Sequence, residues 1–175
     1  MSPERGQYHI TLEEIISNAK EIMFREGKHI PVLIVEGGRS MVAGQIPDMP
    51  PTHGERVEFM RFLGQAAAKS GRIDQLKQVF MVTEGWMSEP SEDIPTRIRP
   101  SEDPNRKEVL IISMIQVQDD KRQMEIFEIV RDSNEQVVEI EKFLPKEKKE
   151  DESVAVPLLD AFVHGFQTRF RTKYN

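Results

Sequence analysis

Residues 108–118 read EVLIISMIQVQ, and this run decides the fold class. Its apolar residues do not alternate with polar ones, so the strand that it predicts must be covered on both faces. Residues 32–35, VLIV, show the same double-sided pattern. We expect these two strands to lie side by side in the middle of one sheet, with helices on both sides.

Four more strands are predicted around these two runs. The Gly37-Gly38 pair is a turn signal, which favours a hairpin between the strand at 31–36 and its successor. Short turns after residue 118 favour an antiparallel meander of three consecutive strands, and the sequence leaves open at which edge the hairpin and the meander join. The additional strands are predicted at residues 40–46, 78–87, 123–131 and 136–143.

Apolar residues at helical spacing predict three amphipathic helices. Thr11-Leu12-Glu13-Glu14 fits a capping box at the start of the first helix, and Gly27 is suited to end it. The second helix is predicted at about 55–70, and the third begins at Pro157, which fits a first helical turn.

The predicted order is therefore α-β-β-α-β-β-β-β-α, an α+β fold with a single, mainly antiparallel sheet of five to six strands flanked by three helices. This order resembles the profilin-like and roadblock-type arrangement with one further strand, a resemblance of element order alone. The chain is read as one α+β domain, 1–175. Residues 88–105 are predicted to form a long surface loop, and residues 145–153 a charged linker to the last helix.

Composition limits the classes of partner and site. The formal net charge is −6, and Lys and Arg are not in excess, so neither nucleic acid nor a membrane is expected as a partner. The chain has no cysteine, which excludes disulfides and thiolate chemistry. The first residues lack the apolar core of a signal peptide, and the expected location is cytoplasmic. No cofactor is expected.

Two carboxylates are candidate catalytic groups. Glu36 ends a buried strand, and Glu84 shares a strand face with Phe80 and Trp86. Burial in apolar surroundings favours the protonated form of a carboxyl group, which can then act as a general acid or base. If the two strand ends meet, the pair could divide these roles. The alternative is that Glu36 is solvated at a turn and that Glu84 pairs with Arg39 or another arginine.

Arginines near the predicted loop form a candidate ligand-binding site. Arg97, Arg99 and Arg106 could bind a carboxylate or phosphate, and Trp86 beside them suits an interface. The alternatives are a loop whose acidic residues neutralise these arginines, and a Trp86 side chain that covers the core. No metal site is expected, because no histidine is spaced for zinc, and no phosphate-binding loop or nucleophile elbow is present.

Two hypotheses follow from different classes. The first is a non-enzymatic protein-interaction or regulatory module, either a homodimer or part of a complex, which associates through an exposed edge strand or the last helix. The second is a small enzyme or an anionic-ligand-binding domain that uses Glu36, Glu84 and the loop arginines. The residues lean toward the first hypothesis, since none of them forms a catalytic signature.

Overall fold

The computed structural model describes residues 9–88, 99, 102–143 and 156–171, with the side chains of 169–171 excepted. Within these residues the order of elements is the predicted one. The helices are α1 (Leu12–Glu26), α2 (His53–Ser70) and α3 (Pro157–Arg171). The strands are β1 (Val32–Glu36), β2 (Met41–Gln45), β3 (Gln78–Met87), β4 (Lys107–Gln116), β5 (Lys121–Arg131) and β6 (Val137–Lys142).

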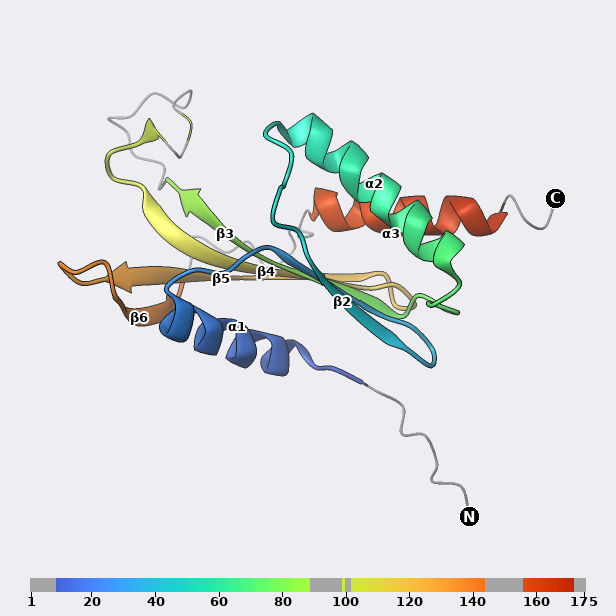
Figure 1. Cartoon of the computed structure of the whole chain (residues 1–175), viewed down its shortest axis with the longest axis horizontal. Helices are drawn as coiled ribbons and strands as arrows, with labels where there is room; N and C mark the ends of the chain where they lie inside the picture. Colours follow the sequence, from blue (N-terminus) through green and yellow to red (C-terminus); the bar gives the residue numbers. More distant parts are fainter. Residues whose placement is uncertain (1–8, 89–98, 100–101, 144–155, 172–175) are drawn as a thin grey trace, which may run out of the picture.

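The strands form one six-stranded sheet in the order β2-β1-β3-β4-β5-β6, and every neighbouring pair is antiparallel. The α+β prediction is thus confirmed. Seen along the sheet in Figure 1, α1 lies on one face, whereas α2 and α3 lie together on the other. The two edges of the sheet are β2 and β6.

The two runs that decide the fold class are not neighbours in the sheet, so this expectation was wrong. Strand β3 lies between them. Its residue Val79 is paired with Val35 of β1 on one side and with Ile115 of β4 on the other. The first five residues of β3 are buried, which makes it at least as covered as β1 and β4. A double-sided apolar pattern identifies internal strands but carries no information on their order.

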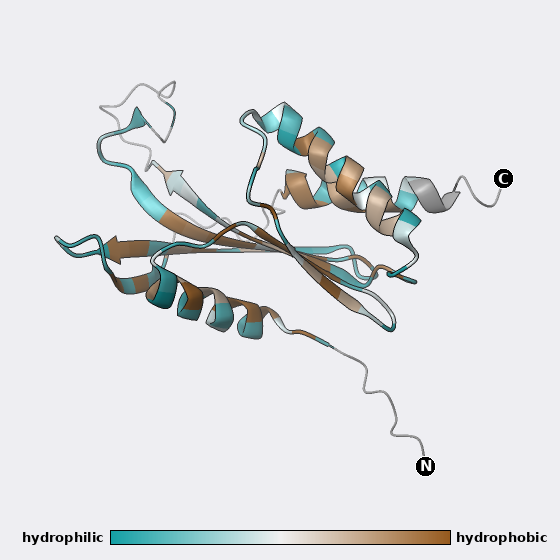
Figure 2. Ribbon diagram, viewed as in Figure 1, coloured by the Kyte–Doolittle hydropathy of each residue, from teal (hydrophilic) through white to brown (hydrophobic). Residues whose placement is uncertain are grey.

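Two apolar cores lie on the two faces of the sheet. Under α1, the buried side chains include Ile15, Met23, Phe80 and Leu110. The other core packs β1, β3, α2 and α3 together around residues such as Phe162. Figure 2 shows the apolar colouring along the middle strands and on the helices that cover them. The sheet is therefore a central layer with helices on both sides.

Local capping explains where the first two helices begin. The predicted box at Thr11 and Glu14 is present, and a second box joins Thr52 to Glu55. The second box starts α2 at His53, two residues before the predicted start. Both helices end at a glycine with positive φ, 71° at Gly27 and 69° at Gly71, as the sequence indicates.

Helices α2 and α3 cross in direct backbone contact. A Cβ atom built on Gly165 would lie 2.9 Å from the Arg61 carbonyl carbon and closer still to its oxygen. A Cβ on Gly64 would meet the Phe162 carbonyl group in the same way. Gly165, which is unfavourable for a helix by propensity, is thus explained by this crossing.

The last helix belongs to the core rather than standing apart from it. Leu159, Phe162 and Phe166 are buried, with exposed fractions of 1%, 1% and 3%. The apolar face of α3 therefore packs against α2 and the sheet. Of the two association surfaces that the sequence suggested, the edge strands remain. The predicted linker at 145–153 and most of the predicted loop at 88–105 lie outside the described residues.

Candidate functional site

Glu36 is held at the end of β1 by hydrogen bonds from three directions. Its side chain is 2% exposed, so the alternative of a solvated turn residue was wrong. The carboxylate accepts hydrogen bonds from the Gln78 amide and, at 3.3 Å, from the Ile10 backbone N–H; His9 Nδ1 lies 3.2 Å away. Gln78 Nε2 also donates to the Ile10 carbonyl at 2.8 Å. Glu36 therefore fastens the segment before α1 to the sheet.

Glu84 lies at the opposite end of the sheet, in a cluster around the end of α1. Its carboxylate accepts a hydrogen bond from the His29 backbone N–H. Nearby, Arg131 donates to both carboxylate oxygens of Glu108, at 2.7 and 2.6 Å, and to the Gly27 carbonyl at 2.8 Å. The bonds to Glu108 raise the pKa of Arg131, and the charge of Glu84 adds to the effect. The cluster fixes the chain that leaves α1.

The structure does not bring the two candidate carboxylates together. Glu36 pairs with Gln78 at the first position of β3, whereas Glu84 is six residues further along that strand. At 3.3 Å per residue the two positions are roughly 20 Å apart, far beyond proton-transfer reach. Division of acid and base roles between them is therefore excluded by geometry.

Of the predicted ligand-binding residues, only Trp86 and Arg106 are seen together. The Arg106 guanidinium lies over the Trp86 ring, 4.5 Å from its centroid, and the Trp86 side chain remains 47% exposed. Arg99 is exposed, and its carbonyl accepts from the Glu102 N–H at 2.8 Å. Arg97 lies outside the described residues. An anion site shared by these arginines stays a prediction.

The two edges of the sheet differ in charge. Strand β6 carries Glu139, Glu141 and Lys142, and charges of this kind protect an edge strand against pairing with another chain. Strand β2 reads MVAGQ and has no charged residue. No described strand pairs with its outer side. Strand β2 is therefore the unprotected edge of the sheet.

The backbone groups on this edge can be assigned from the two ends of the hairpin. The Gly37 N–H donates to the Ser40 carbonyl, and the Ile46 N–H donates to the Pro31 carbonyl, both at 2.7 Å. Because hydrogen-bonded and non-bonded pairs alternate along an antiparallel ladder, Val42 and Gly44 bond to β1. The N–H and C=O groups of Met41, Ala43 and Gln45 point outward, where a further strand would bind.

An apolar groove follows β2 on the α2 face of the sheet. It has a volume of about 540 Å³ and lies between the two N-terminal strands and α2, with Phe162 of α3 among its walls. A Cβ built on Gly44, which lines it, would meet no atom within 4 Å among the described residues. Its apolar lining consists chiefly of Leu33, Val35, Val42, Ile46, Leu63, Ala66, Ala67, Ile73 and Phe162.

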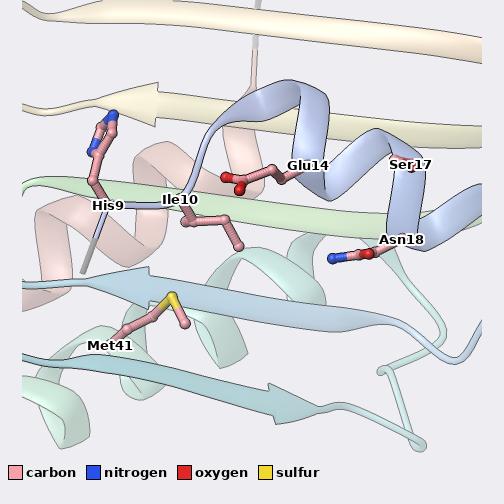
Figure 3. Close-up of a pocket in the computed structure, with 6 residues that line it drawn as sticks. All are labelled: His9, Ile10, Glu14, Ser17, Asn18 and Met41. Carbon is pink, nitrogen blue, oxygen red and sulfur yellow. The ribbon is translucent and has the colours of Figure 1, made fainter.

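A more polar hollow of about 360 Å³ lies beside β2 on the α1 face. Figure 3 shows Ile10 and Met41 pointing into the space between them, with Glu14 and Asn18 of α1 alongside. Hydrogen bonds from the Thr11 backbone and hydroxyl hold the pKa of Glu14 below its ordinary value, so this wall of the hollow is anionic at neutral pH. The side chains of an added strand would alternate between the groove and this hollow.

Asp74 fixes the turn that presents β2. Its carboxylate accepts from the backbone N–H groups of Gly38 and Gln75, both at 2.9 Å, and of Arg39 at 3.4 Å. Desolvation acts to raise the pKa of Asp74, but these hydrogen bonds together hold it below the ordinary value. The hairpin is thus anchored to the α2–β3 connection.

The sequence predicted a strand at 40–46 but did not mark it as a functional edge. The signal that could have identified this edge was the lack of charge in residues 41–45, in contrast to the charged residues at 137–142. Across the described ranges no three His, Asp or Glu side chains are grouped to hold a metal ion. Among the described helices, none has the length and apolar character needed to cross a bilayer.

Comparison with known proteins identifies the family. No curated protein matches the chain, and no solved structure matches it either. One family model matches residues 1–170, and its description is "Bacteriophage lambda protein ea47". The description names no activity, ligand or partner. Because the match covers nearly the whole chain, this protein belongs to the bacteriophage lambda protein ea47 family.

Proposed function

We propose that this protein is a non-enzymatic interaction module that binds an extended polypeptide segment along the free edge of β2. The observation that carries the proposal is the contrast between the two edges. Strand β6 is guarded by three charged residues, whereas β2 has none and is flanked by a hollow on each face. Outward backbone groups supply affinity in this mode of recognition, and pockets for alternate side chains supply selectivity.

The two hollows define the chemistry of the bound segment. Side chains directed to the α2 face enter the groove beside Gly44, which favours aliphatic residues there. Side chains on the other face lie near Glu14 and Asn18, which favours hydrogen-bond donors or a cation. The expected ligand therefore directs apolar side chains to the groove and carries at least one hydrogen-bond donor or cation on its other face.

Two substitutions test the proposal without disturbing the hairpin. Ala43→Pro removes a backbone donor that faces outward, at a position where a strand edge tolerates proline. Gly44→Phe fills the groove from a position where a Cβ meets no atom of the described residues within 4 Å. We expect both variants to unfold at temperatures close to that of the original protein and to bind selected peptides at least about tenfold more weakly.

The measurement uses a phage-displayed library of random decapeptides, selected against the full chain immobilised at low density. Synthetic copies of the enriched peptides are then titrated by isothermal calorimetry, and amide hydrogen exchange locates the site. The expected result is protection of the Met41, Ala43 and Gln45 amides. Val138→Lys on β6 is the matched control and should bind normally. Equal binding by all variants, protection elsewhere, or no enrichment would refute the proposal.

A further inference from the structure

We infer that the strand which pairs with β2 is β2 of a second copy of this chain, giving a dimer with a two-fold axis at Ala43. This inference rests on the proposed function and names its partner. It follows from the register of the free backbone groups, from the shapes of the side chains, and from an exposed aromatic residue on α2.

The free groups of β2 fit a symmetric antiparallel pairing. They belong to Met41, Ala43 and Gln45, so the central residue of the strand is itself one of the outward-facing ones. A two-fold axis there places Ala43 opposite Ala43 and Met41 opposite Gln45, twice. Each of these three pairs is of the type that exchanges two N–H···O=C bonds. Every outward donor and acceptor of β2 then finds a partner.

The side chains on the groove side are complementary to themselves. The same axis sets Val42 of one copy against Gly44 of the other, and it does so on both sides of the axis. Val42 and Gly44 both line the groove, and the space at Gly44 is open. The Val42 side chain of each copy can therefore enter the groove of the other, where it lies over Gly44, which has no side chain to block it.

Helix α2 supplies further apolar surface next to the junction. Phe62 has a 63% exposed side chain and lies one helical turn before Ala66, which lines the groove. A two-fold axis perpendicular to the sheet keeps both α2 helices on the same face, one on each side of the junction. Since a five-residue strand pair alone is small against the roughly 1,200–2,000 Å² of a stable interface, these helices must contribute.

The mass in solution is the first test. Sedimentation velocity of the full chain over a range of concentrations should show a species of twice 20.2 kDa that dissociates on dilution. Gly44→Phe, Ala43→Pro and Phe62→Glu should shift the equilibrium toward monomer by at least about tenfold in Kd. Val138→Lys should dimerise normally.

Cross-linking tests the axis itself. The chain has no native cysteine, so Ala43→Cys introduces a single thiol, which the axis places opposite its own copy at a Cα separation of about 5.5 Å. A short bis-maleimide should join Ala43→Cys chains into dimers in high yield and should leave Val138→Cys chains largely monomeric. Equal yields from the two variants would overturn the two-fold axis at Ala43.

The outcomes separate this inference from the proposed function. A chain that stays monomeric at millimolar concentration while peptides protect the β2 amides refutes the dimer and retains the binding edge. A monomer whose β2 edge binds no peptide refutes both. A dimer that survives Gly44→Phe, Ala43→Pro and Phe62→Glu places the interface elsewhere and refutes the dimer proposed above.

Discussion

Two glutamates, one buried and one partly exposed, attach the segments on either side of α1 to the sheet. Glu36 binds the Ile10 backbone and the Gln78 amide, and Glu84 binds the His29 backbone. Each carboxylate thus satisfies backbone or amide groups where the chain enters or leaves α1. Because donors that lose their acceptor are costly, both residues have a structural reason to be acidic, and Glu36 is in addition buried.

Glu36→Ala should destabilise the protein by roughly 1–3 kcal/mol, because the Gln78 amide and the Ile10 N–H lose their shared acceptor. Urea unfolding followed by circular dichroism measures the change. Glu141→Ala, at an exposed position of β6, is the control and should stay within about 0.5 kcal/mol of the original protein. A Glu36 variant as stable as this control would show that the attachment contributes nothing.

At the scale of elements, the packing of α2 on α3 depends on two glycines. Gly64 and Gly165 let the two backbones touch, which brings Phe162 into the core beneath α2. Helix propensity alone disfavours glycine at both positions by about 1 kcal/mol relative to alanine. Contact between helices therefore outweighs local preference here.

Gly165→Ala should lower the free energy of unfolding by roughly 1–3 kcal/mol or more, since its methyl group would overlap the Arg61 carbonyl and separate the helices. Gly54→Ala is a control of opposite sign. It lies in the first turn of α2, where a Cβ meets no described atom within 4 Å, so we expect no loss and a gain of up to about 1 kcal/mol. The unfolding temperatures of both variants measure this difference. A Gly165→Ala protein as stable as the Gly54→Ala protein would contradict the close backbone contact between α2 and α3.

At the scale of the whole molecule, stability should depend on acid pH through the turn that presents β2. The folded pKa of Asp74 lies below the ordinary value of 3.8, owing to the N–H groups of Gln75, Gly38 and Arg39. A carboxyl group whose pKa is depressed by folding stabilises the folded state fully above its unfolded pKa. That contribution is lost as the pH falls through the lower, folded pKa.

Asp74→Asn should therefore be less stable than the original protein at pH 7, and the difference should shrink as the pH falls below 3.8. Urea midpoints measured between pH 7 and pH 2 (roughly the window in which the group titrates) give this difference directly. Arg39→Ala is the control: the Arg39 side chain is 93% exposed and its Nε lies 3.9 Å from Asp74 Oδ2, so its removal should change the urea midpoint little across this pH range. A difference that stays constant down to the lowest pH would exclude the Asp74 charge as its cause.

The kinds of element in this protein and their order along the chain could be predicted from the amino-acid pattern alone. Capping boxes, terminal glycines and apolar periodicity act over a few residues, so they can be recognised without knowledge of the fold. This is why α1 and the predicted strands appear where expected, with boundaries that differ by at most two residues. The charge on residues 137–142 and its absence from 41–45 were likewise present in the sequence.

Which strands are neighbours in the sheet and which lie at its edges could not be predicted and became clear from the folded chain. Strand β3 lies between β1 and β4, the register places Glu36 and Glu84 at opposite ends of the sheet, and no described strand pairs with the outer side of β2. The physical reason is that apolar burial has no direction: an internal strand is covered equally well at several places in a sheet. Edge position is a property of the assembled sheet, so β2 can be identified as an uncharged edge strand only after the other strands are placed.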